Sequence, residues 1–373
     1  MGNTKRLVAL DVFRGATIAL MITVNNPGSW GHIYSPLEHS KWSGCTPTDL
    51  VFPFFLFIVG VSMWFAFRKY NHEFTKPAVV KIIKRAFIIF GIGLFLNALR
   101  PVSGVGEFFT NWRIVGVLQR IGIAYGIGSL IVLYFNEKKI IWISAILLLG
   151  YWVLLAFTGG FSLEGNLVRQ VDMFLLGSSH IYHGYDGIPF DPEGLLSTIP
   201  AIVTPILGYF AGKIITTLSD NKEIVKKLII RGIGFTILGY FWGFFFPINK
   251  PIWTSSYVIY SGGLSMIILG IAIYLIDVKG YKKLTQPFVV FGMNPLFIFV
   301  LSSFVAKTLV YILRWETADG SIMTGKLWLY QNIFMPLANN VEINASLLFA
   351  VVTIIIYWLI VDILYKKNIF IKI

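Results

Sequence analysis

The stretch Leu50–Phe67, LVFPFFLFIVGVSMWFAF, contains no charged residue. A helix that crosses a lipid bilayer needs about 20 predominantly apolar residues, which this stretch nearly supplies. The whole 373-residue chain has the same character, since 56% of its residues are apolar and only 13% are charged. Such a composition excludes a soluble enzyme and a disordered chain, and the lone Cys45 excludes a disulfide scaffold. The sequence therefore predicts an all-α, polytopic transmembrane helical bundle.

Apolar segments recur along the chain and define the expected spans. The ten segments are Leu7–Val24, Leu50–Phe67, Ala86–Ala98, Ile114–Phe135, Ile140–Phe157, Leu195–Ile215, Leu228–Phe246, Tyr257–Ile276, Pro287–Leu309 and Ala345–Tyr365. We predict about 10 spans in one transmembrane domain covering residues 1–373, because no internal repeat or linker divides the chain. The pair Asn294–Pro295 predicts a broken helix within the ninth segment.

The basic residues predict the orientation. The formal net charge is +13, which in a membrane protein reflects cytoplasmic lysines and arginines rather than nucleic-acid binding. With Met1 placed inside, 21 of the 31 basic residues lie in cytoplasmic loops and 8 lie outside. Both termini are therefore expected to be cytoplasmic. The polar, aromatic and Gly/Pro-rich sequence then falls in the outer loops, so we expect the functional site at the exoplasmic face.

Charged residues inside predicted spans are costly and need a partner. Asp11 and Arg14 share one face of the first span, where they either satisfy each other or place Arg14 in a polar cavity that meets a phosphate or substrate. Arg120 lies two helical turns after Arg113 in the fourth span. Arg113 can reach the interface by extending its side chain, whereas Arg120 must find a carboxylate or a phosphate.

The first outer segment combines the side chains that proton transfer needs. Asn25, His39, Trp42 and Asp49 lie within it, and a carboxylate beside an imidazole can orient the ring of a general base. Each residue also has an ordinary alternative role. His39 and Trp42 suit a membrane interface, and Asp49 can cap the second span.

The second outer segment carries His180, His183 and Asp186, followed by Asp191 and Glu193. The histidine spacing only faintly matches a metal site and no third strong ligand follows, so we expect no metal. Asp191 before Pro192 either starts a helix or, with Glu193, hydrogen-bonds a polyhydroxylated or amine substrate.

Several longer stretches together resemble one family, the transmembrane heparan-α-glucosaminide N-acetyltransferases and their bacterial relatives. They occur in order as LDVFRG (10–15), VNNPG (24–28), HSKWSG (39–44), TPTDLVFPFFLFIVG (46–60), RIVGVLQRIG (113–122), VDMFLLGSSHIY (171–182), DPEGLLSTI (191–199), PINKPIWTSSYV (247–258), FGMNP (291–295) and YKKNIFIKI (365–373). The ordered set covers almost the whole chain. The sequence lacks the long N-terminal extension of the lysosomal members, and in this it resembles a compact bacterial form of the family.

The resemblance implies transfer of an acetyl group from cytoplasmic acetyl-CoA to the amino group of a glucosamine beyond the membrane. His39 falls on the family's catalytic histidine, Asn25 on an associated asparagine and Asp49 on the acid at the start of the second span. The acceptor stays open among a heparan end, free glucosamine and a cell-wall fragment. Whether the acetyl group rests on His39 before it reaches the amine is also open.

The expected partners follow from this reading. The phosphates of acetyl-CoA need basic residues, for which the candidates are Arg14, Lys81, Lys84, Arg85, Arg120, Lys227 and Arg231. Candidate sugar contacts are Trp42, His180, Asp191 and Glu193. We expect an inner-membrane enzyme that contacts lipid and binds no nucleic acid, with a homodimer as one assembly left open. An amino-sugar permease is the main alternative, because intramembrane charges and a broken helix also suit transport, and a scaffold subunit is a weaker one.

Overall fold

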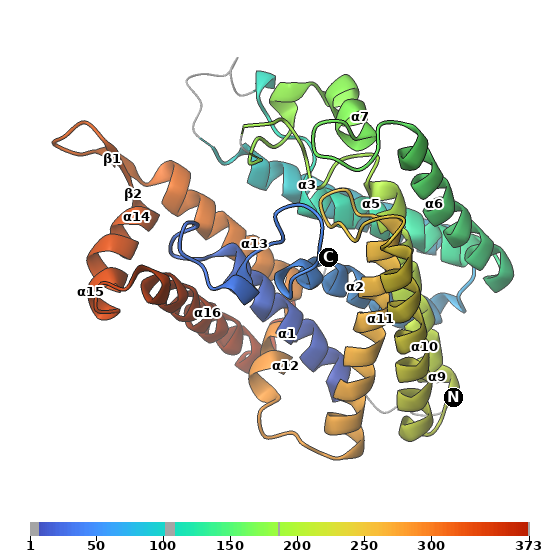
Figure 1. Ribbon diagram of the computed structural model, residues 1–373. Helices are drawn as coiled ribbons and strands as arrows, with labels where there is room; N and C mark the ends of the chain where they lie inside the picture. The colour runs from blue at the N-terminus through green and yellow to red at the C-terminus, as the bar shows by residue number, and fades with distance from the viewer. Residues whose placement is uncertain (1–6, 101–108, 186, 372–373) are drawn as a thin grey trace.

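The computed structural model describes residues 7–100, 109–185 and 187–371, which form a bundle of helices (Figure 1). The first half contains α1 (Val8–Asn25), α2 (Val51–Phe67), α3 (Lys76–Ala98), α5 (Val117–Tyr134), α6 (Glu137–Phe157) and α7 (Leu167–Leu176). The second half contains α8 (Thr198–Ala201), α9 (Val203–Thr217), α10 (Asn221–Trp242), α11 (Ser255–Ala272), α12 (Gln286–Met293), α13 (Pro295–Lys307), α14 (Gly325–Leu329), α15 (Met335–Leu337) and α16 (Glu342–Lys366). Two short strands, β1 (Arg314–Glu316) and β2 (Ile322–Thr324), pair antiparallel.

The predicted helical class is confirmed, with this small hairpin as the exception. The hairpin turns at Gly320, whose φ of +80° suits a residue without a Cβ atom. Strands of three residues are too short to show a recognisable pattern, so the sequence did not predict the hairpin.

Among the described residues, eight helical segments are long and apolar enough to cross a membrane. The protein is therefore a helical membrane protein. Two further predicted spans correspond to α3 and α10, which are long helices with basic first halves. The helix α3 begins at Lys76, well before the predicted Ala86, because lysine and arginine are good helix formers and continue the helix. The count of ten spans stays a prediction, as does the placement of the termini, since residues 1–6 and 372–373 lie outside the described residues.

Helices that pack closely do so through small residues. A Cβ atom on Gly60 of α2 would lie 1.9 Å from the backbone oxygen of Pro205 in α9. A Cβ atom on Gly208 of α9 would lie 1.9 Å from the oxygen of Phe57. Close backbone approach at glycine is typical of helices that associate in lipid. These contacts hold α2, whose first turn carries part of the site, against α9.

The predicted break at Asn294 is confirmed. The helix α12 ends at Met293 and α13 begins at Pro295, because proline has no N–H to continue the helical hydrogen bonds. The side chain of Asn294 donates to the oxygen of Ile369 at 3.0 Å and accepts from the nitrogen of Ile371 at 2.8 Å. The break thereby fixes the last described residues of the chain against the bundle.

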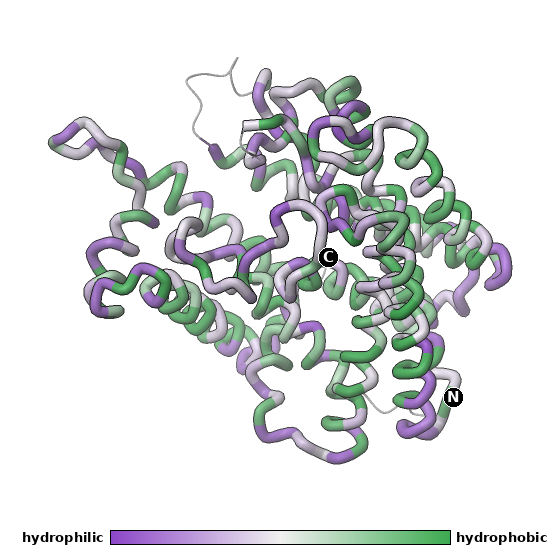
Figure 2. The backbone as a smooth tube through the Cα atoms, viewed as in Figure 1, coloured by the Kyte–Doolittle hydropathy of each residue, from purple (hydrophilic) through white to green (hydrophobic). Residues whose placement is uncertain are grey.

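The surface of the bundle has the polarity that a bilayer requires. Hydrophobic residues run along the outer helices, while hydrophilic residues gather at helix ends and in the β1–β2 hairpin (Figure 2). Large apolar side chains are exposed on α6 and α10, among them Trp142, Phe157 and Phe241. In water such a surface would be unfavourable, whereas lipid covers it without cost.

Candidate active site

A cavity of about 810 Å³ opens where the end of α1 meets the beginnings of α2 and α5. Its wall combines four predicted site residues, Asn25, His39, Asp49 and Glu193, with residues from distant parts of the chain. The other polar or aromatic lining residues are Trp30, Ser40, Lys41, Thr48, Phe52, Arg113, Tyr182, Tyr185 and Lys250. The volume lies in the range of small-molecule sites. The cavity therefore brings the first and second outer segments together.

His39 and Asp49 form a hydrogen-bonded pair in this wall. Nδ1 of His39 lies 2.6 Å from Oδ1 of Asp49. The other carboxylate oxygen of Asp49 accepts from the backbone nitrogens of Ser40 at 3.1 Å and Thr46 at 3.0 Å. The carboxylate is buried, while the imidazole is 41% exposed. A fixed carboxylate on Nδ1 leaves Nε2 as the ring nitrogen available to a reactant.

Local structure explains why Asp49 sits there. It lies in a single 3₁₀ turn, Thr48–Leu50, directly before α2. Rather than capping α2, its carboxylate accepts hydrogen bonds from the loop that carries His39. Tyr257 of α11 donates its hydroxyl to the backbone oxygen of Asp49 at 2.5 Å. The acid is thus held from both the loop side and the bundle side.

Lys250 completes a three-residue cluster. Its Nζ lies 3.2 Å from Nδ1 and 3.4 Å from Nε2 of His39, and 3.7 Å from Oδ1 of Asp49. Burial lowers the pKa of Lys250, while the negative charges of Asp49 and Glu193 act in the opposite direction. The turn before α11 positions the lysine, because the side chain of Asn249 accepts from the nitrogen of Ile252 at 3.0 Å.

A second cluster of charges forms another part of the wall. Arg113 donates two hydrogen bonds of 2.7 Å to Asp191 and a third of 2.7 Å to Glu193. Its guanidinium lies 5.2 Å from the ring centre of Tyr182. Although burial acts to lower the pKa of Arg113, the two carboxylates raise it above its usual range. With one positive and two negative side chains, this cluster carries a net negative charge, although Lys41 and Lys250 also line the cavity.

Here the structure differs from the simplest sequence interpretation. Arg113 pairs with acids far along the chain, a pairing that the sequence did not indicate. No helix begins at Asp191 among the described residues around it, and α8 starts only at Thr198. The carboxylate of Asp191 instead accepts from the nitrogen of Glu193 at 3.0 Å, which fixes Glu193 beside the cavity.

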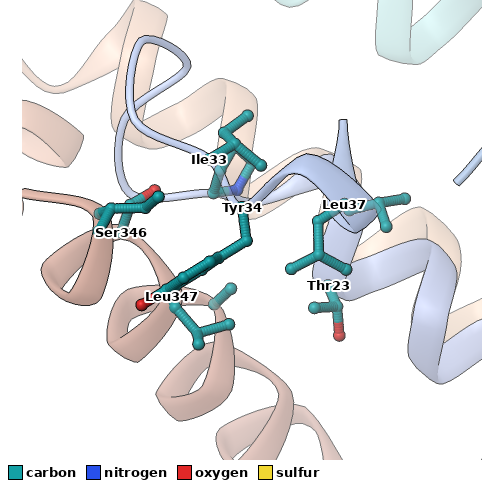
Figure 3. Close-up of a pocket in the computed structure, with 10 residues that line it drawn as sticks. Thr23, Ile33, Tyr34, Leu37, Ser346 and Leu347 are labelled. Carbon is teal, nitrogen blue, oxygen red and sulfur yellow. The ribbon is translucent and has the colours of Figure 1, made fainter. Parts of the chain in front are cut away.

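The loop between α1 and α2 is anchored to α16. The backbone nitrogen of Ser29 donates to Oγ of Ser346 at 3.1 Å, and Tyr34 donates its hydroxyl to the side chain of Asn344. Figure 3 shows Tyr34 lying over Leu347, next to a small cavity of about 10 Å³, which is room for about one water. These contacts restrict the loop that presents His39.

Of the four predicted sugar contacts, Glu193 lines the cavity and Asp191 is buried next to it, whereas Trp42 and His180 lie outside the cavity wall. Trp42 donates its indole N–H to the oxygen of Phe161 at 2.8 Å and packs edge-on against Phe190. Nδ1 of His180 lies 2.7 Å from the backbone oxygen of Trp112. Their observed contacts hold loops together, and direct contact of either residue with a sugar stays a prediction.

Two predicted phosphate partners lie inside the bundle. Arg14 contacts Asp11 at 3.3 Å and Ser62 of α2 at 3.0 Å. Arg120 donates to the oxygen of Gly194 at 3.3 Å, and its guanidinium lies 4.9 Å from the ring centre of Trp253. Only 1% of Arg120 is exposed. Both arginines join neighbouring elements in the structure.

Lys84 and Arg85 lie in a separate groove of about 700 Å³. It runs along the first half of α3 and also carries Lys76 and Lys81. The end of α3 lies at the cavity, because Asn97 donates to the oxygen of Arg113 at 3.1 Å. At 1.5 Å per residue, Arg85 is about 20 Å along the helix from this end. The basic groove and the cavity therefore occupy opposite ends of α3.

Within the described residues, no group of three or more metal-ligating side chains is present. Asp186, which the sequence places near His180 and His183, lies outside the described residues. Cys45 is partly buried, and burial raises the pKa of its thiol to about 12, with the charge of Asp49 adding to the effect. A thiol of this kind is a poor nucleophile at neutral pH.

The fold and the cavity define a class: a helical membrane protein with a histidine, a fixed carboxylate and a lysine together in a cavity at one end of its bundle. This set can accept a proton from a nucleophile and stabilise a negative charge that develops on an oxygen.

Comparisons with known proteins identify the family. Residues 6–230 match the family model described as heparan-alpha-glucosaminide N-acetyltransferase, catalytic. The mouse heparan-alpha-glucosaminide N-acetyltransferase is 29% identical over 431 aligned positions, covering 100% of this chain and 61% of the mouse protein. The human enzyme of the same name is 28% identical, covering 99% of this chain and 60% of the human protein. The chain spans about 60% of the length of these relatives, and it belongs to the heparan-α-glucosaminide N-acetyltransferase family.

Sequence reasoning assigned no role to Lys250 of the cavity wall. Lys250 is 211 positions from His39, so no local pattern joins them. The signal was present in the stretch PINKPIWTSSYV (247–258), where the lysine is the one charged residue in an otherwise uncharged stretch before a span. Arg113 was noticed, but its partners Asp191 and Glu193 could not be assigned to it before the fold was known.

Proposed function

We propose that this protein transfers an acetyl group from acetyl-CoA to the amino group of a glucosamine-type sugar. The His39–Asp49 pair, beside Lys250 in the wall of the 810 Å³ cavity, is the observation that carries the proposal. The names of the mouse and human relatives support the same reaction class. The acceptor is a terminal or free glucosamine, or a cell-wall fragment that carries one.

The chemistry requires one proton acceptor and one stabilised oxyanion. The amine nitrogen attacks the thioester carbon, a C–N bond forms, the C–S bond breaks, and CoA leaves as a thiol. Nε2 of His39 accepts the proton that the amine loses and returns a proton to the departing sulfur. Asp49 holds the ring by Nδ1 and stabilises the imidazolium that forms.

The oxygen of the acetyl group becomes negative during attack and needs donors. Lys250 lies 3.4 Å from Nε2 of His39, so a carbonyl attacked next to Nε2 has its oxygen within reach of the ammonium. Asn25, in the same wall, supplies an amide donor. Donors that are already in place can lower the barrier by several kcal/mol. The donors Lys250 and Asn25 serve the oxyanion on either route, but the role of His39 differs. In direct transfer Nε2 is the base, whereas in the stepwise route Nε2 attacks the thioester, carries the acetyl group and is released when the amine attacks, so that the amine's proton then passes to solvent.

The amine must reach the cavity, where the cluster around Glu193 offers it a negatively charged binding place. Glu193 lines the cavity, and the Arg113–Asp191–Glu193 cluster carries a net negative charge. A protonated amino sugar is attracted to this cluster and has hydroxyl groups for Tyr182 and Glu193. It loses one proton to solvent before the neutral amine attacks, and the second proton is the one that His39 accepts. We therefore place the acceptor sugar between Glu193 and His39.

The donor enters from the other end of the bundle. The basic groove on α3 supplies Lys84 and Arg85 for the phosphates of CoA, while the pantetheine arm extends about 20 Å toward the cavity. In this arrangement the basic loops are cytoplasmic, both termini lie inside, ten spans cross the inner membrane, and the cavity opens to the exoplasmic side. The whole chain acts as one transmembrane domain.

Product formation separates this enzyme from the permease, which the broken helix at Asn294 would also suit. The purified protein in detergent should form N-acetylglucosamine and free CoA in equal amounts from acetyl-CoA and glucosamine. A permease would release neither product. Uptake of labelled glucosamine into proteoliposomes without acetyl transfer would replace our proposal with transport.

Cysteine labelling tests the orientation. A cysteine introduced at position 41 should react with an impermeant maleimide from outside the cell, and one at position 139 only after the membrane is opened. The native Cys45 contributes little background, because the pKa of its thiol is raised to about 12. The reverse pattern would place the cavity in the cytoplasm and contradict our topology.

A further inference from the structure

A groove of about 960 Å³ on the outside of the bundle is separate from the candidate active site. Its two rims are formed by α6 and α10, and its floor by side chains of α9 and α11. Apolar lining residues dominate it, among them Leu149, Ile206, Phe210, Leu238 and Phe241. None of the residues that line the cavity around His39 also lines this groove.

The two rims stand apart over most of their length and meet at one end. Trp152 of α6 and Trp242 of α10 touch edge to face there, with ring centres 5.6 Å apart. Below this contact the rim side chains Leu149, Leu238 and Phe241 are about half exposed. The groove is therefore closed at the ends of α6 and α10 and open along its side to the bilayer.

The opposite end of the groove is charged. Glu137, the first residue of α6, and Arg231, in the first half of α10, both belong to the lining. Glu137 is paired with Lys213. Arg231 makes no hydrogen bond, ion pair or ring contact within residues 7–100, 109–185 and 187–371. An arginine next to apolar membrane surface requires an anion or water.

The length of the groove fits one leaflet of a bilayer. At 1.5 Å per residue, the distance from Arg231 to Trp242 along α10 is about 16 Å, and that from Glu137 to Trp152 along α6 is about 22 Å. Half of a hydrocarbon core of about 30 Å is about 15 Å. A chain that starts at the charged end therefore reaches the tryptophan contact after crossing one leaflet.

We propose that this groove binds an anionic phospholipid, with its phosphate at Arg231 and an acyl chain extending to the contact between Trp152 and Trp242. The lipid belongs to the leaflet at which α6 and α10 begin. Its acyl chain covers the apolar floor and the half-exposed rims, and its phosphate supplies the anion that Arg231 lacks in the described structure. A flexible chain suits a long, concave groove better than the rigid surface of a second copy of this protein.

Native mass spectrometry of the full chain in detergent tests the proposal with palmitoyl-oleoyl phosphatidylglycerol and its phosphatidylcholine analogue as probes. The native protein should retain phosphatidylglycerol in preference to phosphatidylcholine. Arg231→Gln should weaken phosphatidylglycerol binding about fivefold, the ratio expected for one basic residue at an anionic headgroup, and remove the preference. Leu149→Trp should fill the groove and reduce binding of both lipids.

Matched controls separate the groove from the general surface. Lys226→Gln removes an exposed basic residue of α10 outside the groove, and Leu154→Trp enlarges an exposed residue of α6 outside it. Both should bind phosphatidylglycerol like the native chain. Thermal unfolding with and without the lipid gives a second readout, in which the native protein and both controls are stabilised and Leu149→Trp is not.

Three outcomes would overturn the proposal. The first is phosphatidylglycerol binding that is unchanged in both Arg231→Gln and Leu149→Trp. The second is a dimer that Leu149→Trp dissociates while lipid binding persists, which would assign the groove to a second copy. The third is a raised KM for acetyl-CoA in Arg231→Gln with native lipid binding, which would assign the arginine to the phosphates of CoA.

Discussion

Two groups of charged residues lie in this bundle and differ in access. In the first, His39 is 41% exposed and lines a cavity together with Asp49 and Lys250. In the second, Arg120 is 1% exposed, donates to the oxygen of Gly194 and lies over the ring of Trp253. Both groups are unusual in a membrane protein, yet a reactant can reach only the first.

This difference shows what a buried charge in a membrane protein indicates. Arg120 attracts attention in the sequence because it interrupts an apolar span, but in the structure its guanidinium joins α5 to the segment before α8. His39 stands out less, since it lies in a polar loop. A charged or ionisable group that lines a cavity therefore indicates a functional site. The energetic cost of placing a charge inside the membrane does not by itself indicate one, because residues that hold helices together also carry that cost. Variants of the exposed group around His39 should therefore affect turnover, and variants of buried residues such as Arg120 should affect stability.

Among the residues that surround His39, Asp49 is expected to have the largest effect on turnover. Asp49→Asn keeps the shape of the side chain but removes the charge that orients Nδ1 of His39 and stabilises an imidazolium. We expect acetyl transfer to fall by about 10³ to 10⁴-fold, as for other His–Asp pairs, with little change in the KM for acetyl-CoA. Steady-state rates with acetyl-CoA and glucosamine measure this.

Glu38→Gln is the matched control, because this exposed acid precedes His39 and its side chain does not line the cavity. It should leave the rate within about twofold of native. A rate for Asp49→Asn within tenfold of native would remove the pair from the mechanism.

The next effect concerns Lys250, whose ammonium is assigned to the acetyl oxygen. Lys250→Met should lower turnover by about 10² to 10³-fold, as loss of one oxyanion donor does. Lys41→Met, a lysine in the same cavity wall, is the control and should stay within a few-fold of native.

The pH dependence gives a signature that a structural role for Lys250 would not produce. Burial lowers the pKa of Lys250, so the ammonium loses its proton below the usual lysine range. Turnover should therefore fall as the pH rises through that lowered pKa. Lys250→Arg keeps its charge at high pH and should move this decline upward. An identical alkaline profile in the arginine variant would contradict the role.

On the buried side, Arg120→Met should affect stability more than turnover. The methionine keeps apolar contact with Trp253 but loses the hydrogen bond to Gly194, so we expect a loss of about 1–3 kcal/mol in unfolding free energy. Turnover at low temperature should stay within about threefold of native. Thermal unfolding followed by size exclusion and the KM for acetyl-CoA provide the measurements. A KM raised tenfold with native stability would instead make Arg120 a CoA contact.

Much of the fold was predictable and the cavity only partly so, for a physical reason. Apolar runs such as Leu50–Phe67 predict helices locally, and Asn294–Pro295 predicts a break, because both depend on neighbouring residues. His39 and Asp49 are ten positions apart and meet within one loop. Lys250 joins them only after α10 and α11 pack side by side (Figure 1), and no local property of the chain encodes that meeting.

The smallest effect on turnover is expected at Asp172 in α7, which is also buried. Burial raises its pKa to about 7, with the charge of Asp191 adding to this and a hydrogen bond from Leu195 opposing it. In the unfolded chain the pKa is about 3.9, so the unfolded state loses its proton first as the pH rises. The native state therefore loses stability between about pH 4 and pH 7.

Asp172→Asn removes the carboxyl group whose ionisation destabilises the native state. It should raise the unfolding temperature at pH 8, where the expected gain is on the order of a few kcal/mol, and the gain should shrink as the pH is lowered to 5. Turnover should not change. A variant less stable than native at pH 8 would show that the carboxylate is charged and stabilising in the folded protein.

The most direct test of the account is acetyl transfer by the purified native protein and by His39→Ala, with acetyl-CoA and glucosamine in detergent. The native protein should form N-acetylglucosamine, and folded His39→Ala should be slower by at least about 10³-fold, as much as Asp49→Asn, because the reaction loses its general base. Equal turnover by the native protein and a folded His39→Ala variant would contradict the claim that the cavity around His39 carries out the chemistry.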